Sequence, residues 1–448
     1  MSTERPSEDA ARKSLWRAIR RSLLGKYSLY AVNAISTIVL ARFFAPEAFG
    51  IVAIGMVLFT FTQLLAEAGI GPAIINLRHL EPEDRDGIFS FLLVLGLALG
   101  VLLFVSAGPI AAFFGEEQIT ITVRMIAPVV LFQAAASLPV ALLLREQKFL
   151  HISAAGITGE LISTAATILL SHRFDPVTSL SAKMPIMSFC QLTIAWILSG
   201  KTEFGRTGFG TKFSAIAAIA RSSSAQFGFN FVNFFSRNLD SILVGKFLGF
   251  EALGFYNRSY QLMRYPLLLL SFSLVPAIQP VLRGYVSDPL EVERINRELS
   301  WKLGALGCAA GLVIWIGADV IVRILLGPGW EPSARLLEIF AISIPCQVIA
   351  ATSGGFYQAF NRMGLLFMTG LITSFINVAG MFVGALSGNL ETLCWWIVGS
   401  FSVSFCANYF ILYRFVLALP VAKFVRSSGL LAIGFVVIMS AVDVLIRQ

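Results

Sequence analysis

Long apolar runs recur from one end of this chain to the other, and they constrain its fold more than any other feature. Thirteen such segments stand out. Each is long enough to cross a hydrocarbon core about 30 Å thick. Because lipid offers the backbone no hydrogen-bonding partner, such runs must form helices, and an all-α polytopic membrane protein is predicted. The segments are 22–42, 48–76, 88–113, 121–145, 150–171, 177–198, 216–248, 252–283, 299–326, 333–360, 364–387, 390–414 and 425–446.

The composition supports this class of fold. Of the 448 residues, 56% are hydrophobic and only 13% are charged. A soluble domain carries about twice that charged fraction. The net charge of +8 comes from cations placed between apolar runs, which indicates membrane topology and not a nucleic-acid partner. The five cysteines and three histidines show no metal-ligand spacing, so we expect neither a metal nor a cofactor.

The distribution of lysine and arginine predicts the orientation. With the N-terminus in the cytosol, 23 of these residues fall on the cytosolic side and 8 on the outer side, Lys183 and Arg335 among the latter. This asymmetry is typical of multi-pass proteins. Residues 1–21 are predicted to form a basic amphipathic tail that lies against anionic membrane lipids. An odd number of segments places the C-terminus outside.

Two similar stretches indicate an internal repeat. IVLARFFAPEAFGIV (38–52) and ILVGKFLGFEALGFY (242–256) each run from an apolar segment through a cation and Phe to Glu-Ala and Gly. Six segments separate them, so both copies share one orientation. This predicts two six-helix lobes in parallel pseudo-two-fold repeat around a central cavity. The predicted division is an N-lobe at 22–198, a cytosolic linker at 199–213, a C-lobe at 214–414 and an additional segment at 415–448.

Short motifs predict packing and not catalysis. The chain has no Walker A sequence, no G-x-S-x-G and no H-E-x-x-H, so no enzymatic activity is expected. Three G-x-x-x-G motifs, beginning at Gly96, Gly307 and Gly380, are expected to bring helices close together. Gly50 and Gly254 in the repeat are expected to allow tight turns or close packing. Residues 283–302 are predicted to form an amphipathic cytosolic helix with Leu290, Ile295 and Leu299 on its apolar face.

Ionisable residues inside the apolar segments are the candidates for function. A charge at membrane depth costs at least about 2.5 kcal/mol, so it faces protein or water. One hypothesis is a cationic cavity for an anionic headgroup, because arginine binds phosphate with two donors at once. The alternatives are an i, i+3 ion pair between Arg237 and Asp240, and an Arg258 that extends to the outer surface. The candidate binding residues are Arg237, Arg258, Arg264, Asn257 and Tyr260.

Carboxylates inside the segments form a second group of candidates. Glu67, Glu160 and Asp240 are each either a protonatable group coupled to transport or a partner in an interhelical contact. Tyr256, in contrast, fits an aromatic belt at the membrane surface better than a sugar contact.

The same region resembles a known family. SRNLDSILVGKFLGFEALGFYNRSYQLMRYP (236–266) resembles the polysaccharide exporters of the MOP flippase superfamily, in particular the colanic acid and succinoglycan exporters, which are Wzx-like. LARFFAPEAFGIVAI, LLAEAGIGPAIINLRHL and LLGPGWEPSARLLEIFAI are similar to the same family. The resemblance implies twelve to fourteen helices and the flipping of a polyprenyl-diphosphate-linked oligosaccharide across the bacterial inner membrane by alternating access. It also implies a polysaccharide polymerase and an export complex as partners.

Two other functions remain open. A cation-coupled drug antiporter of the same architecture would need acidic residues in its cavity. Among the candidate intramembrane residues, the four arginines Arg221, Arg237, Arg258 and Arg264 outnumber the three carboxylates Glu67, Glu160 and Asp240. A membrane polysaccharide polymerase would need a large external loop, which the chain does not offer.

Overall fold

A computed structural model describes residues 8–67, 80–213, 234, 238–271, 275–286, 288–425 and 429–447. Within this part of the chain every regular element is a helix. The chain divides into two compact units, Met1–Phe234 and Phe235–Gln448. Each unit is described by itself. The compact units divide after residue 234, whereas the sequence predicts a linker at 199–213. This division does not test the predicted lobes and linker, which stay a prediction.

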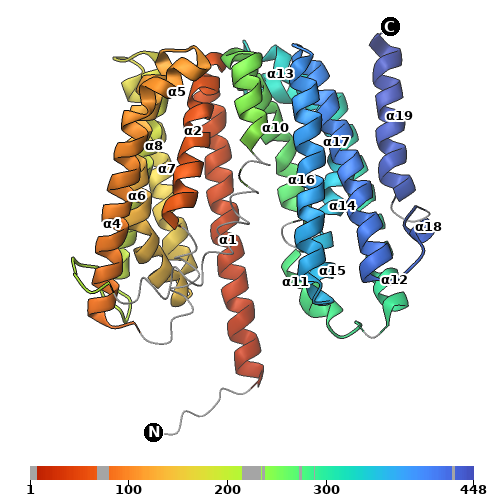
Figure 1. Ribbon diagram of the computed structural model, residues 1–448, viewed down its shortest axis with the longest axis horizontal. Helices are drawn as coiled ribbons and strands as arrows, with labels where there is room; N and C mark the ends of the chain where they lie inside the picture. Colours follow the sequence, from red (N-terminus) through yellow and green to blue (C-terminus); the bar gives the residue numbers. More distant parts are fainter. Residues whose placement is uncertain are drawn as a thin grey trace. The chain divides into compact units, whose positions relative to one another are not determined.

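Unit 1 is a bundle built around one central helix (Figure 1). This helix, α6, packs on α2, α4 and α8, and most of its side chains are buried. A second row forms where α7 packs on both α1 and α8. The elements are α1 (Glu8–Ala41), α2 (Pro46–Glu67), α4 (Pro82–Val105), α5 (Ala107–Phe114), α6 (Gln118–Arg145), α7 (Phe149–Leu170) and α8 (Pro176–Ser199).

Unit 2 contains two long antiparallel helices, α16 and α17, that pack along their lengths (Figure 1). The long helix α12 packs on the short helices α13 and α14, and α10 packs on α13. After a helical segment at 238–247, the elements are α10 (Phe250–Ser271), α11 (Val275–Leu282), α12 (Pro289–Leu325), α13 (Glu331–Ala341), α14 (Ile344–Ala350), α15 (Ser353–Ala359), α16 (Met363–Leu386), α17 (Leu390–Ile411), the π-helix η1 (Leu412–Val416), α18 (Val421–Phe424) and α19 (Leu430–Arg447).

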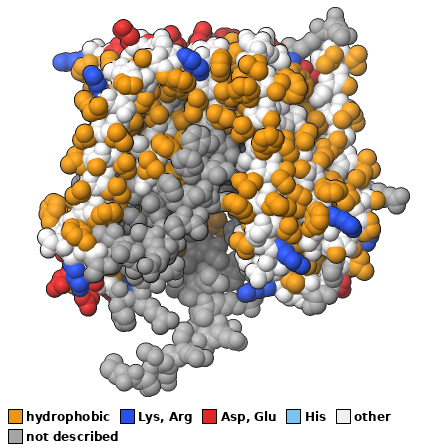
Figure 2. All heavy atoms as spheres, in the orientation of Figure 1, with side chains coloured by type: hydrophobic (Ala, Val, Ile, Leu, Met, Phe, Trp, Pro, Cys, Tyr) orange, Lys and Arg blue, Asp and Glu red, His pale blue; other side chains and the backbone are white. Residues whose placement is uncertain are grey.

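Most of the predicted membrane segments match apolar helices, but α10 and α11, at the predicted segment 252–283, are not among the helices that are long and apolar enough to span a membrane. In the described part of the chain, nine helices are long and apolar enough to span a membrane. Helix α13 together with α14 and α15 is apolar enough as a pair but is bent by 55°, which fits either a broken span or a re-entrant loop. Residues 430–446 form a shorter apolar helix at the last predicted segment. Segment 216–248 lies largely outside the described residues. Figure 2 shows hydrophobic side chains over the sides of each unit, with charged ones toward the ends. The protein is therefore a multi-pass membrane protein.

Both copies of the sequence repeat lie at a junction between two helices. In the first copy α1 ends at Ala41 and α2 begins at Pro46, and in the second a helix ends at Phe247 and α10 begins at Phe250. The expectation of a tight turn at Gly50 and Gly254 is wrong, because both are buried within helices. The left-handed residue of the second turn is Gly249, with φ of 91°. Glycine adopts that conformation without a steric penalty.

The three G-x-x-x-G motifs bring helices together, as the sequence predicts. A Cβ atom added at Gly96 would stand 2.7 Å from the Cβ atom of Ala134 on α6. The same addition at Gly384 would stand 2.8 Å from the Cα atom of Leu393 on α17. Both distances are shorter than carbon atoms tolerate, so the absence of a side chain permits the close approach of these helices. Gly100, Gly307, Gly311 and Gly380 make equally close approaches.

The predicted cytosolic helix at 283–302 exists from Pro289 onward, where it forms the first turns of α12. Its predicted apolar face is wrong, however, because Leu290 is exposed. The buried face mixes apolar and polar residues: Val292 and Leu303 are buried, Asn296 donates from Nδ2 to the Tyr413 hydroxyl at 3.0 Å, and Ser300 is also buried. Hydrogen bonds to neighbouring elements permit this burial of polar groups.

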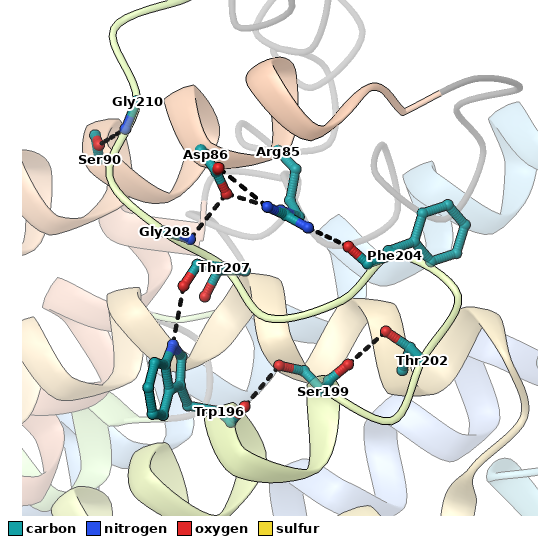
Figure 3. Close-up of polar contacts among 10 residues, drawn as sticks. All are labelled: Arg85, Asp86, Ser90, Trp196, Ser199, Thr202, Phe204, Thr207, Gly208 and Gly210. Atoms are coloured by element: carbon teal, nitrogen blue, oxygen red, sulfur yellow. Dashed lines mark hydrogen bonds and ion pairs between the residues drawn. The ribbon is translucent and has the colours of Figure 1, made fainter.

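Residues 200–213, predicted as a linker, are docked onto unit 1 (Figure 3). We call this segment the strap. Asp86 of α4 accepts from the backbone N–H of Gly208 at 2.8 Å through Oδ1, and Ser90 accepts from that of Gly210 at 2.9 Å. Trp196 of α8 donates from Nε1 to the carbonyl of Thr207 at 3.0 Å.

Charged side chains hold the remainder of the strap. Arg85 donates to the carbonyl of Phe204, and its Nε also donates to Asp86 at 2.7 Å (Figure 3). Lys148 donates to the carbonyl of Lys201 at 2.6 Å. Because the backbone groups of the strap find partners on α4, on α8 and on the connection between α6 and α7, it is part of unit 1.

Candidate functional site

One face of α10 packs into unit 2. Tyr256, Ser259 and Met263 on this face are buried. The hydroxyl of Ser259 donates to the carbonyl of Ser333 on α13 at 2.8 Å. The rings of Tyr256 and Tyr260 lie 5.7 Å and 5.5 Å from the ring of Phe340, also on α13. These contacts fix the rotation of α10 about its axis.

Another face of the same helix carries polar side chains. Arg258 donates from Nη1 to Oε1 of Gln261, which in turn donates from Nε2 to the hydroxyl of Tyr265 at 3.3 Å. Positions 258, 261 and 265 follow helical spacing, so the three side chains form a ladder. Asn257 precedes the ladder, and Arg264 continues it and is exposed. We call Asn257, Arg258, Gln261, Arg264 and Tyr265 the polar face of α10.

The polar face carries positive charge and an unused donor. It includes two arginines, and residues 257–265 contain no Asp or Glu. The Nδ2 atom of Asn257 is buried without a hydrogen-bond partner among the described residues. A buried donor without a partner is costly and indicates that another group binds there. Gln261 was missed in the sequence analysis, although its spacing from Arg258 could have identified it.

Tyr256 and Asp240 lie together, away from the polar face. Asp240 is buried and accepts from the hydroxyl of Tyr256 at 2.7 Å and from the backbone N–H of Ser241 at 2.7 Å. The expected aromatic-belt position of Tyr256 is wrong, since this side chain is buried. Its ring also stacks on that of Tyr260 at 5.9 Å. Arg237 lies outside the described residues, so its ion pair with Asp240 stays a prediction.

A buried ion pair joins two helices of unit 1. Glu160 of α7 is 2% exposed, and its Oε1 atom lies 2.7 Å from Nζ of Lys183 on α8. Lys183 was counted among the outer-side cations within the predicted segment 177–198, and the structure places it in the second turn of α8, with its side chain 17% exposed. Lys183 follows the connection at 171–175 by nearly as many residues as Glu160 precedes it. Helices joined by a short connection bring such positions side by side, so this spacing could have predicted the pairing. Glu67 is the last residue of α2, and its side chain is outside the described part.

Arg335, another of the cations counted on the outer side, belongs to α13. Its guanidinium contacts Asp443 of α19 at 2.7 Å, Glu338 at 3.0 Å and Glu391 of α17 at 3.0 Å. This network ties the last helix to the rest of unit 2. Within the described residues, no group of three or more His, Cys, Asp or Glu side chains could hold a metal ion.

The fold of this multi-pass membrane protein is similar to the folds of solved transporters. The structure superimposes on the inward closed conformation of the lipid II flippase MurJ with a TM-score of 0.74 at 14% identity, covering 94% of this chain and 98% of that one. It superimposes on an inward-facing multidrug resistance MATE transporter of the MOP superfamily with a TM-score of 0.64 at 15% identity, covering 90% and 98%. These similarities confirm the predicted fold.

The chain belongs to the polysaccharide biosynthesis protein family, whose model matches residues 39–335. It is 21% identical to the succinoglycan biosynthesis transport protein ExoT of Rhizobium meliloti over 86% of this chain and 77% of that protein. It is 18% identical to the lipopolysaccharide biosynthesis protein WzxC of Escherichia coli over 91% and 83%. It is 23% identical to the teichuronic acid biosynthesis protein TuaB of Bacillus subtilis over 75% and 69%. The predicted family is therefore confirmed.

Proposed function

We propose that this protein flips a polyprenyl-diphosphate-linked oligosaccharide across the bacterial inner membrane for exopolysaccharide synthesis, by alternating access. The N-terminus is cytosolic in this proposal, and the protein is not an enzyme. The observation that carries it is the polar face of α10, where Arg258, Arg264 and the unused donor of Asn257 share one side of the helix. Relatives named as transport and polysaccharide biosynthesis proteins support the substrate class.

The chemistry of such a substrate fits these residues. A bare diphosphate cannot enter hydrocarbon, because an unpaired ion loses its hydration there. Guanidinium groups replace that hydration with paired N–H donors while the polyprenyl tail stays in the bilayer. We assign Arg258, Arg264 and Arg237 to the diphosphate or to acidic sugars, and Asn257 and Tyr260 to sugar hydroxyls. Glu67, Glu160 and Asp240 are the proposed candidates for coupling to an ion gradient.

The test begins with cells that lack this gene alone. Single repeat units on lipid diphosphate are expected to accumulate on the cytosolic leaflet, and surface polysaccharide is expected to disappear. Normal delivery of repeat units to the outer leaflet without polymerisation would indicate a polymerase instead. No change in either pool, combined with greater sensitivity to cationic drugs, would indicate an antiporter.

Complementation with variants then tests the site. Arg258→Gln and Arg264→Gln are each expected to lower export at least tenfold at unchanged protein level. Arg323→Gln is the matched control, because Arg323 is an exposed arginine in the last turn of α12, away from the polar face. Wild-type export by Arg258→Gln would contradict the proposed site, and loss of export by the control would show a general effect of lost charge.

A further inference from the structure

Residues 412–425, which include η1 and α18, follow α17 and precede α19; we call this segment the interfacial hairpin. It begins with the π-helix η1, in which the N–H of Leu417 donates to the carbonyl of Leu412 at 3.0 Å. The chain then reverses at Ala418, whose φ is 54°, before α18 begins at Val421. Single π-helical turns are rare and occur frequently at functional sites.

Aromatic stacking holds the interfacial hairpin in place. The ring of Phe424 lies 5.0 Å from that of Tyr409, at an angle of 22°, and 5.8 Å from that of Tyr413. The Tyr413 hydroxyl accepts from Asn296 of α12 at 3.0 Å. Because offset aromatic pairs and a buried hydrogen bond act together, the hairpin has a fixed position against α12 and α17.

The fixed hairpin presents cations outward. Arg414 follows Tyr413, Lys423 precedes Phe424, and both are exposed. Arg297 follows Asn296, the partner of Tyr413, and is exposed on α12. None of these three cations forms an ion pair with a residue that the structure describes. Nearby carboxylates do not neutralise them: Glu293 is 5% exposed, and Glu298 pairs with Lys302 at 2.6 Å.

Apolar side chains accompany the three cations. Phe415 is 52% exposed and Val425 is 47% exposed, each next to or within two residues of an exposed cation. Figure 2 shows Lys and Arg side chains set among hydrophobic ones toward the end of unit 2 that carries α11, α15 and the start of α12. Cations beside exposed aromatic and aliphatic groups match the boundary between headgroups and acyl chains.

We propose that the interfacial hairpin, together with Arg297, binds the phosphodiester headgroup of an anionic phospholipid. Arg414 and Arg297 would each offer paired donors to the phosphate, Lys423 would add a point charge, and Phe415 and Val425 would contact the acyl chains. In the proposed orientation the hairpin faces the cytosolic leaflet, so the leaflet assignment rests on the proposed function. The binding itself does not require the oligosaccharide substrate.

The test measures lipid binding by the purified full-length protein in detergent. Phosphatidylglycerol and phosphatidylcholine are titrated separately, and the bound lipid is counted by native mass spectrometry. Each cation near a membrane surface contributes about 1 kcal/mol to anionic lipid binding, which corresponds to about a fivefold change in affinity. The double variant Arg414→Gln/Lys423→Gln is therefore expected to bind phosphatidylglycerol roughly 25-fold more weakly, and adding Arg297→Gln should weaken binding about fivefold further.

Two controls make the result specific. Arg323→Gln removes an exposed arginine at the other end of α12 and should leave phosphatidylglycerol binding unchanged. Arg414→Lys/Lys423→Arg keeps both charges and should retain binding within about twofold. Equal binding of phosphatidylcholine by the wild-type protein, or undiminished phosphatidylglycerol binding by the triple variant, would overturn the proposal. Phosphatidylglycerol binding by the wild-type protein, together with normal delivery of repeat units to the outer leaflet in cells that lack the gene, would contradict only the proposed function.

Discussion

Replacing Lys183 by methionine is expected to destabilise unit 1 strongly, because it leaves a carboxylate without its cation. Glu160 is 2% exposed, so water cannot take over the role of the ammonium group. At the observed 2.7 Å and an effective dielectric constant of about 20, the attraction is about 6 kcal/mol, and desolvation of both ions offsets much of it. We expect a loss of about 3 kcal/mol in the free energy of unfolding for Lys183→Met.

The reverse change should cost less. Glu160→Gln leaves Lys183, which is 17% exposed and flexible enough to reach a more polar position. We expect a loss of about 1–2 kcal/mol for this variant. The double variant Glu160→Gln/Lys183→Met removes both charges and should lie within about 1 kcal/mol of the wild type. The coupling energy of the double-mutant cycle is then about 3 kcal/mol.

Thermal unfolding of the purified variants in detergent measures the differences in stability that make up the double-mutant cycle. For a unit of this size, 1 kcal/mol corresponds to about 2–4 °C in Tm, so Lys183→Met should unfold on the order of 10 °C below the wild type. The double variant should recover most of that loss. Strictly additive losses would refute the argument, because they would show that the two charges do not stabilise each other. A stable Glu160→Gln protein that fails to flip substrate would support a coupling role for Glu160.

Two further predictions concern the strap and a helix cap. Gly87→Ala should displace the strap, because its Cβ would overlap the carbonyl oxygen of Lys212, whereas Gly108→Ala has open space and should not. Limited proteolysis within residues 200–213 should accelerate only in the first variant, and equal rates would contradict the docked position. Burial raises the pKa of Asp175, but hydrogen bonds from the side chain and backbone N–H of Thr178 outweigh burial and hold that pKa below its ordinary value of 3.8. A carboxylate with a lowered pKa stabilises the fold above the unfolded pKa and loses this effect as pH falls through the folded pKa. Asp175→Asn should keep the cap of α8 while its Tm falls less steeply than that of the wild type from pH 5 to pH 3, and Asp175→Ala should cost about 1 kcal/mol at pH 7. Parallel Tm curves for wild type and Asp175→Asn would contradict this assignment.

The membrane helices could be predicted from the sequence because their signal is local. For an apolar run long enough to cross the bilayer, the helix is the one low-energy conformation, whatever surrounds it. The close helix contacts at Gly96 and Gly384 could be predicted for a similar reason, since a missing side chain permits an approach that no other residue does.

The contacts that were missed depend on residues far apart in the chain. The glycines and charges of residues 200–213 suggest a flexible linker, yet Asp86 and Ser90, more than a hundred residues earlier, bind its backbone N–H groups. On α12 the apolar residue Leu290 is exposed and the amide of Asn296 is buried, because Tyr413 supplies a hydrogen bond that the local sequence does not reveal. Hydrophobic periodicity cannot predict a polar core contact whose partner comes from another helix.

The charged residues inside the helices have different kinds of partner in the two units, and this difference bears on the substrate. In unit 1 the charge of Glu160 is matched by Lys183, so the pair is neutral as a whole. In unit 2 the buried carboxylate Asp240 accepts from Tyr256, on the packed side of α10, while Arg258 donates to the neutral amide of Gln261 on the polar face. The residues of the polar face therefore bear a net positive charge of their own. An anionic ligand would gain from this charge and a cationic drug would be repelled, which is the physical basis for preferring a diphosphate-linked substrate to the antiporter alternative.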